Sequence, residues 1–147
     1  AASGSTQHLS IGGRGSKLAE GPVEIDGELM SRSNGRFDLE DRQSHLASMN
    51  GVHIDMGPCA VVRHRDVTIL LTSRKTPPFD LGQLRSHGII QESLSAIGIK
   101  AAVAHRRAYD PIVKGSYTVS TPGPCSSDIR SFPFRHVRRP IFPLDTI

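Results

Sequence analysis

Two apolar runs separated by two residues constrain the fold more than any other feature of the sequence. Residues 60–64 and 67–72 are rich in valine, isoleucine and leucine, and they flank Arg65-Asp66. Short β-branched runs on either side of a two-residue turn are typical of a β-hairpin. Because both runs are densely apolar, we expect this hairpin to lie at the centre of a sheet.

The rest of the chain is broken too often for long helices. It has 14 glycines and 10 prolines in 147 residues, a composition that predicts many turns and argues against a helical bundle. Its length suits a single domain over residues 1–147, in which residues 1–9 are expected to be a flexible or linking segment. No apolar run approaches the ~18 residues of a membrane-spanning helix.

Smaller patterns add strands and a helix around the hairpin. Residues 22–33 alternate in polarity, which predicts a strand with one acidic face and a bulge at Gly27. Asp80 is placed to cap a short helix through Leu84 and Arg85, and Gly88 to end it.

The most site-like stretch is residues 97–121. Its pattern predicts a buried strand over residues 99–103, a short helix over 107–113 and a second strand over 116–120, which together form a βαβ-like unit. His105, Arg106 and Arg107 follow the first strand. In such units ligands bind at the carboxyl ends of the strands, so this cluster is a candidate site.

These patterns together predict an α+β fold. We expect a mixed β-sheet with a central hairpin, one βαβ-like unit and a few short helices. The last part of the chain, residues 133–145, contains three prolines and several spaced apolar residues. Since proline disrupts both helices and central strands, this part is predicted to be an extended tail held against a domain surface.

Charge is distributed unevenly along the chain. Residues 1–60 have 5 basic and 8 acidic side chains, a net charge of −3, whereas residues 61–147 have 13 basic and 6 acidic, a net charge of +7. A basic half fits an anionic ligand or an acidic partner, and it also fits a solvated surface. The basic residues are not interleaved with aromatic ones, so nucleic acid is not the expected partner.

Metal and thiol chemistry are weakly represented. His53 and Asp55 share one face of a predicted strand, but a third ligand is missing nearby, and an exposed polar strand face is the favoured interpretation. Cys59 and Cys125 are isolated and are expected to be buried thiols in a reducing, cytoplasmic environment. We therefore predict neither a metal site nor a cofactor in this chain.

Several short blocks in a fixed order extend the interpretation. They are Pro22-Val-Glu, Asp55-Met-Gly-Pro, Thr72-Ser-Arg, Pro78-Phe-Asp-Leu, Leu84-Arg-Ser with Gly88-Ile, His105 with Arg107-Ala and Pro111-Ile, Pro122-Gly-Pro, and Arg138-Arg-Pro-Ile with Pro143-Leu-Asp. In this order and spacing the chain resembles the C-terminal domain of the MlrC family, the microcystinase-type zinc metallopeptidases of bacteria. The sequence departs from the family pattern at Arg106, where an aromatic residue is common.

The resemblance implies that the metal site lies in a different domain from this chain. In the MlrC family the zinc and its His, Asp and Glu ligands belong to the N-terminal domain, and no residue of this chain matches those ligand motifs. The chain is therefore expected to be an accessory domain that shapes or covers an active site in a partner N-terminal domain, with a small peptide as a possible substrate. No catalytic residue and no metal ligand is assigned here.

Three basic residues are candidates for substrate binding or for contact between the domains: Arg74, His105 and Arg107. Two alternatives stay open. The chain could be a stand-alone binding module for an acidic ligand or partner, or it could hold an autonomous metal site at His53 and Asp55.

Overall fold

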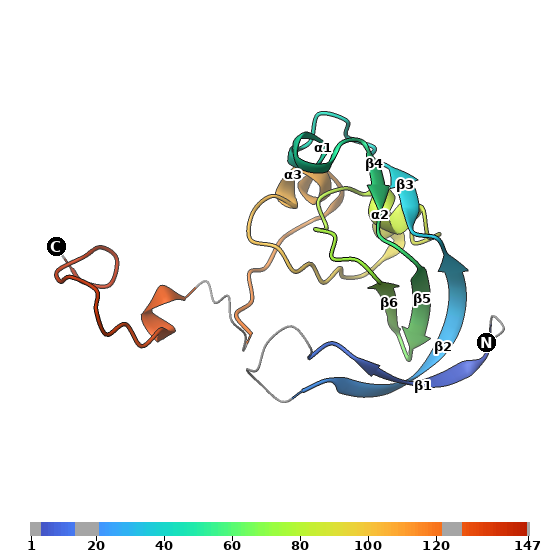
Figure 1. Ribbon diagram of the computed structural model, residues 1–147, viewed down its shortest axis with the longest axis horizontal. Helices are drawn as coiled ribbons and strands as arrows, with labels where there is room; N and C mark the ends of the chain where they lie inside the picture. Colours follow the sequence, from blue (N-terminus) through green and yellow to red (C-terminus); the bar gives the residue numbers. More distant parts are fainter. Residues whose placement is uncertain (1–3, 14–20, 122–127, 147) are drawn as a thin grey trace. The chain divides into compact units, whose positions relative to one another are not determined.

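The computed structural model describes residues 4–13, 21–121 and 128–146, and these divide into two compact units (Figure 1). The larger unit contains residues Ala1–Ser10 and Glu24–Ser116, and the smaller one contains Ile11–Val23 and Tyr117–Ile147. The single domain expected from the chain length stays a prediction.

A four-stranded sheet is the main element of the larger unit. Its strand order is β1-β2-β5-β6, formed by Thr6–Ile11, Val23–Ser33, Cys59–His64 and Val67–Thr72. The β5–β6 pair is an antiparallel hairpin closed by the pair His64 and Val67, which confirms the predicted hairpin. Since β1 begins at Thr6, residues 6–9 belong to the sheet and not to a linking segment.

Strand β2 is irregular at a different place from the predicted one. Its register against β5 shifts between Leu29 and Ser31, whereas the bulge was expected at Gly27. Gly27 serves close packing instead, because a Cβ atom there would lie 2.3 Å from Cγ1 of Val62. A missing side chain thus lets β2 and β5 approach each other.

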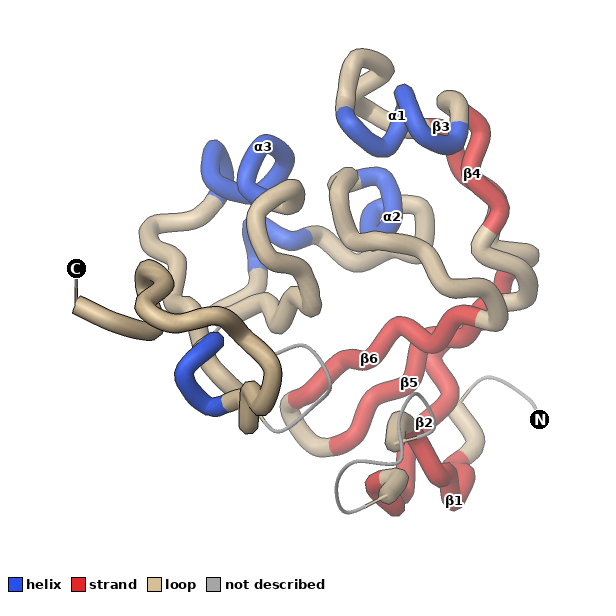
Figure 2. Tube along the Cα trace, turned by 60° about the vertical axis from the view of Figure 1, so that its left-hand side comes forward, coloured by secondary structure: helices blue, strands red, loops and turns tan. Residues whose placement is uncertain are grey.

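A second sheet, of two strands, lies beside the helices of the larger unit, away from the turn of the β5–β6 hairpin. Strands β3 (Arg36–Asp38) and β4 (His53–Asp55) pair antiparallel around α1 (His45–Asn50), whose first turn is capped by Ser44. Figures 1 and 2 both show helices α1, α2 (Gly82–Arg85) and α3 (Arg106–Tyr109) gathered away from the turn of the β5–β6 hairpin. The main buried cluster between these elements contains Phe37, Leu39, Leu46, Ile54, Met56 and Cys59. Burial of Cys59 agrees with the sequence, and Cys125 lies outside the described residues.

The predicted βαβ-like unit is wrong. Neither residues 99–103 nor residues 116–120 form a strand, and Val103 is 68% exposed. A short apolar run becomes a strand only when a partner strand is available, and the main sheet ends at β6. Only the helical part is confirmed, as α3 followed at Pro111 by the 3-10 turn η2 (Asp110–Ile112).

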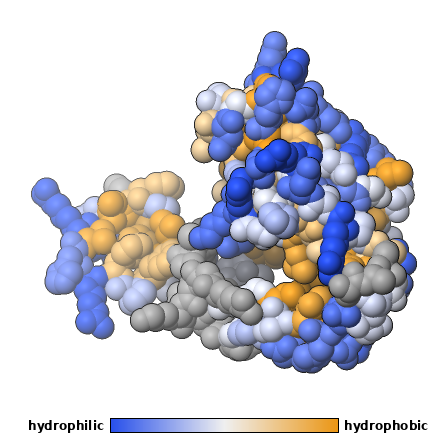
Figure 3. All heavy atoms as spheres, turned by 45° about the vertical axis from the view of Figure 1, so that its right-hand side comes forward, coloured by the Kyte–Doolittle hydropathy of each residue, from blue (hydrophilic) through white to orange (hydrophobic). Residues whose placement is uncertain are grey.

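The described part of the smaller unit contains one regular element, the 3-10 turn η3 (Ile129–Ser131), which begins at the capping residue Asp128. An ion pair between Arg139 and Asp145 closes a turn, and Asp145 also accepts a hydrogen bond from the Ile141 N–H group at 2.7 Å. Figure 3 shows apolar residues at the surface, and in this unit Phe134, Ile141 and Phe142 are exposed. The extended, surface-bound tail stays a prediction.

The helices of the described residues are all too short or too polar to cross a membrane. The α+β class is confirmed, with an antiparallel sheet, the predicted hairpin and short helices. The hairpin was expected at the centre of the sheet, but it lies at one side, because β6 is the last strand.

Gly35 provides a test of the junction between the two sheets. It has a φ of +69°, and a Cβ atom there would lie 2.0 Å from the Gly57 carbonyl oxygen. We expect Gly35→Ala to lower the free energy of unfolding by about 3 kcal/mol, because backbone strain and overlap add together. Urea denaturation measures the change.

A matched control separates strain from overlap. Gly88, after α2, has a φ of +76°, but a Cβ atom added there would have no other atom within 4 Å, so Gly88→Ala should cost only about 1 kcal/mol. Equal losses in the two variants would contradict the close approach at Gly35.

Candidate functional site

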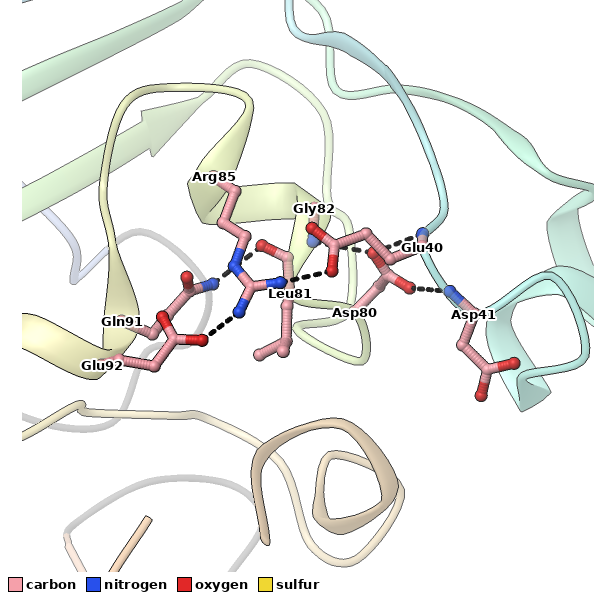
Figure 4. Close-up of polar contacts among 8 residues, drawn as sticks. All are labelled: Glu40, Asp41, Asp80, Leu81, Gly82, Arg85, Gln91 and Glu92. Carbon is pink, nitrogen blue, oxygen red and sulfur yellow. Dashed lines mark hydrogen bonds and ion pairs between the residues drawn. The ribbon is translucent and has the colours of Figure 1, made fainter. Parts of the chain in front are cut away.

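A buried carboxylate organises the polar centre of the larger unit. The Asp80 side chain accepts hydrogen bonds from the N–H groups of Gly82 at 2.8 Å, Glu40 at 3.1 Å and Asp41 at 3.0 Å (Figure 4). The residue is 1% exposed. The sequence predicted Asp80 as the cap of α2, but the N-cap residue is Leu81, and the Asp80 side chain instead holds the N–H group of Gly82, the first residue of that helix. Its other two bonds fix a loop 40 residues earlier in the chain. A buried charge of this kind is stable because backbone donors replace the lost water.

An arginine joins this loop to the segment after α2. Arg85 forms ion pairs with Glu40, at 2.5 Å, and with Glu92. Partial burial lowers the pKa of the Arg85 guanidinium, but the two carboxylates outweigh it and raise that pKa overall. Gln91, next to Glu92 in the turn η1 (Gln91–Ser93), donates a hydrogen bond to the Leu81 carbonyl oxygen at 2.7 Å.

Helix α3 adds a tyrosine to the same centre. Tyr109 is 3% exposed, and burial is the main cause that raises the pKa of its hydroxyl. The negative charge of Asp80 raises this pKa further, whereas the nearby Gln91 amide lowers it. Hydrogen bonds of Asp80 and Gln91 thus hold the loop at residues 40–41, α2 and η1 together, and the buried Tyr109 places α3 beside them. We call this set of contacts the Asp80 network.

Two of the candidate residues from the sequence are paired with different acids. The Arg107 side chain, on α3, lies 2.5 Å from an Asp41 carboxylate oxygen, at the edge of the Asp80 network. Arg74, which follows β6, lies 2.8 Å from an Asp55 carboxylate oxygen, and Arg36 approaches the same carboxylate at 3.4 Å. Both Arg74 and Arg107 remain more than half exposed, so their pairing leaves surface for another anion.

The third candidate, His105, immediately precedes α3. Its carbonyl oxygen accepts hydrogen bonds from the N–H groups of Ala108 and Tyr109, both at 3.1 Å. Its buried Nδ1 atom has no hydrogen-bond partner in the part of the chain that the structure describes. The described contacts do not join His105, Arg74 and Arg107 into one cluster.

Both paired aspartates have lowered pKa values. The Gly57 N–H group is the largest cause that lowers the pKa of Asp55, and Arg74 and Arg36 lower it further against the opposing effect of burial. The Gln43 N–H group does the same for the pKa of Asp41, with Arg107 as a further cause that lowers it.

The residues that are described do not fit a zinc site. No group of three or more His, Cys, Asp or Glu side chains among them could hold a metal ion. His53 instead bonds to Asp38 across β3–β4 at 2.6 Å, and Asp55 is occupied by arginines. The alternative of a metal site at His53 and Asp55 gains no third ligand among the described residues.

A shallow hollow of about 380 Å³ lies over strands β3 and β4. It is lined by Arg36, Phe37, Asp38, His53, Ile54 and Asp55. One of the lining residues, Asp55, forms an ion pair with the candidate residue Arg74. Charged groups of both signs surround its two apolar lining residues, Phe37 and Ile54, and the hollow is largely open to solvent.

The sequence and the fold are shared with known proteins. The model of the MlrC C-terminus family matches residues 1–136. The chain belongs to this family. This MlrC C-terminal domain also resembles the crystal structure of a protein named "putative metallopeptidase" from Mesorhizobium sp. BNC1, with a TM-score of 0.75 and 25% sequence identity.

The two chains differ greatly in length. The similarity covers 99% of this chain but only 28% of the Mesorhizobium chain. No curated protein matches the chain significantly. These comparisons establish the family and the fold of this chain, and they do not establish an activity.

Sequence reasoning missed most of the Asp80 network. Asp80 was predicted as a helix cap, but its bonds to residues 40–41 join segments that no local pattern connects. Tyr109 was also missed. The sequence offered one signal for its burial, namely that it is an aromatic residue two positions after the candidate Arg107.

Removal of the Asp80 charge tests the network. We expect Asp80→Asn to lower the free energy of unfolding by about 2 to 3 kcal/mol, because a buried amide cannot accept all three N–H groups. Urea denaturation at neutral pH measures the loss. The control Asp66→Asn alters an exposed turn residue and should change stability by less than about 0.5 kcal/mol.

Acid should weaken the fold through Asp41 and Asp55. Their pKa values lie below the ordinary 3.8, so their contribution to stability is complete above that value. It is lost as the pH falls through the lowered values, because the unfolded chain then binds more protons. Denaturation curves for the wild type and Asp55→Asn, measured from neutral to acidic pH, should show a shallower loss in the variant. Parallel curves would contradict the assignment for Asp55.

Proposed function

We propose that this chain is the accessory C-terminal domain of a zinc-dependent metallopeptidase or amide hydrolase. The observation that carries the proposal is the match to the MlrC C-terminus over residues 1–136. The similarity to the Mesorhizobium protein, over 28% of its chain, supports a place within a longer polypeptide. A catalytic zinc centre needs typically three protein ligands, and the described residues of this chain offer no such group.

In this proposal the N-terminal domain supplies the metal chemistry. A zinc ion held in that domain would supply polarisation of the scissile carbonyl and activation of a water molecule. This chain supplies surface and positive charge beside that centre. Arg74 and Arg107 each keep an exposed guanidinium, which is suited to a carboxylate of a small peptide or to acidic groups of the N-terminal domain.

The rigid setting of Arg107 supports this role. Arg107 binds Asp41, and the Asp41 N–H group is held by the buried Asp80 carboxylate. A guanidinium fixed in this way loses little conformational freedom when it binds an anion. His105 lies two residues before Arg107 and is the third candidate for this role.

Activity of the longer polypeptide tests the proposal. Zinc content and hydrolysis of a panel of small peptides should be measured for this chain alone and for this chain joined to its N-terminal domain. We expect neither zinc nor hydrolysis in the chain alone and both in the longer polypeptide. Stoichiometric zinc in the isolated chain would overturn the proposal.

Arginine variants of the longer polypeptide test the substrate-facing role. We expect Arg107→Ala and Arg74→Ala to lower kcat/KM by about tenfold or more, the cost of one charge-assisted contact. The control Arg63→Ala removes an exposed arginine of β5 and should leave kcat/KM unchanged. Equal losses in all three variants, or none, would contradict the role of Arg74 and Arg107.

A stand-alone binding module for an acidic ligand is the second candidate. The excess of basic residues in the second half of the chain favours it. Such a module would bind a polyanion such as polyglutamate with an affinity that falls steeply as salt rises, whereas an accessory domain would not.

A further inference from the structure

Both asparagines of the chain stand directly before a glycine. Asn34 precedes Gly35 and Asn50 precedes Gly51, and both asparagines are exposed. In such a pair the glycine backbone nitrogen can attack the amide carbon of the asparagine side chain, since glycine has no Cβ atom to obstruct the approach. The nitrogen must lose its proton in order to react. The acceptor of the glycine N–H group therefore decides how readily each site reacts.

At Gly35 this acceptor is a hydroxyl group that contacts a histidine. The Gly35 N–H group donates to Oγ of Ser33 at 3.1 Å, and this Oγ atom lies 2.7 Å from Nε2 of His87. Ser33 ends strand β2 and His87 follows helix α2, so the fold brings the two side chains together from distant segments. A continuous path of hydrogen bonds thus leads from the backbone nitrogen to an imidazole.

The other nitrogen of the imidazole fixes the direction of this path. Nδ1 of His87 lies 3.0 Å from the Gln83 carbonyl oxygen, which can only accept a hydrogen bond. The Ser86 hydroxyl, also 3.0 Å from Nδ1, donates to the same carbonyl at 3.4 Å. The neutral ring therefore carries its proton on Nδ1, and Nε2 accepts the hydroxyl proton of Ser33. His87 is thereby placed as a general base for the Gly35 nitrogen, with Ser33 between them.

The amide carbon of Asn34 is also prepared for attack. The Arg36 N–H group donates to Oδ1 of Asn34 at 3.1 Å. Negative charge develops on this oxygen when a nucleophile attacks the amide carbon, and a backbone donor that is already in place stabilises that charge. The turn thus supplies both a base for the attacking nitrogen and a donor for the developing oxyanion.

We propose that the folded chain deamidates itself at Asn34. Ser33 passes the Gly35 N–H proton to His87, the Gly35 nitrogen forms a bond with Cγ of Asn34, and the bond from Cγ to Nδ2 breaks. The proton returns to Nδ2, which leaves as ammonia, and a five-membered succinimide ring remains. Water then opens the ring at one of its two carbonyl carbons, and the product is aspartate or isoaspartate.

Asn50 has the same following residue but no such base. The Gly51 N–H group donates to the Ala47 carbonyl oxygen at 2.9 Å, at the end of helix α1. A carbonyl oxygen has no proton to pass on, and it is too weakly basic to remove one from an amide. The fold therefore directs the reaction to Asn34, although both asparagines precede a glycine.

Isoaspartate at position 34 would disturb the junction between the two sheets. It adds one carbon atom to the main chain just before Gly35, whose carbonyl oxygen accepts a hydrogen bond from the Met56 N–H group at 2.9 Å. A Cβ atom at Gly35 would lie 2.0 Å from the Gly57 carbonyl oxygen, so this segment has little room to shift. The modified chain is expected to unfold more readily, and this property is independent of the proposed hydrolase function.

The two asparagines test the proposal within one protein. The 147-residue chain should be incubated near neutral pH, folded and in concentrated guanidinium chloride, and the gain of one mass unit at each asparagine followed by mass spectrometry of its peptides. We expect folding to slow the reaction at Asn50, where the N–H group is held by a carbonyl, and to speed it at Asn34. A slower reaction at Asn34 in the folded protein than in the denatured one would overturn the proposal.

Two substitutions test the path of the proton. We expect Ser33→Ala and His87→Gln each to slow deamidation at Asn34 of the folded protein by about tenfold or more, the contribution of a general base. Neither should alter the rate at Asn50, or the rate at Asn34 in guanidinium chloride. The control His8→Gln removes an exposed histidine of β1 that bonds to Asp26, and it should leave both rates unchanged. Equal rates at Asn34 in the folded wild type and folded His87→Gln would refute the relay, and the comparison of the two asparagines needs no variant to fold.

Discussion

The larger unit depends on one carboxylate that has no contact with water. Asp80 is 1% exposed, and three backbone N–H groups from two distant segments replace its hydration. Such an arrangement tolerates little change, because loss of one of the three donors would leave a buried charge only partly compensated. Helix α2 has only four residues and cannot be stable by itself, so this contact makes its position definite.

The surface charges depend on the same contact. Glu40 and Asp41 are held at their N–H groups by Asp80, and their side chains in turn hold Arg85 and Arg107. A chain of polar contacts thus connects the buried Asp80 carboxylate, through residues 40–41, to the guanidinium groups of Arg85 and Arg107. Only 37% of the residues are hydrophobic, so the apolar core is modest. Polar contacts therefore fix the positions of segments that apolar packing would fix in a larger protein.

The parts of the fold that were predictable from the sequence are those encoded locally. The β5–β6 hairpin follows from two apolar runs and a two-residue turn, and a short helix just after Asp80 follows from the local pattern, although its N-cap residue is Leu81. Residues 99–103 carry the same kind of apolar signal, yet they form no strand, since pairing depends on a neighbour that the run itself does not specify. Likewise, the bonds from Asp80 to residues 40–41 join segments whose proximity only the folded chain creates. Arg74 and Arg107 were recognised by type and place, but their acidic partners could not be predicted.

The fixed carboxylate at Asp41 has a consequence for the selectivity of Arg107. Asp41 engages the Nε–H group of Arg107, and its own N–H group is held by Asp80, so this carboxylate has little freedom to move away. In the proposed role, a second anion would reach the exposed side of the guanidinium and would share its charge with Asp41. Repulsion between the two anions would weaken that contact, so a ligand would need a further contact with the protein in order to bind firmly.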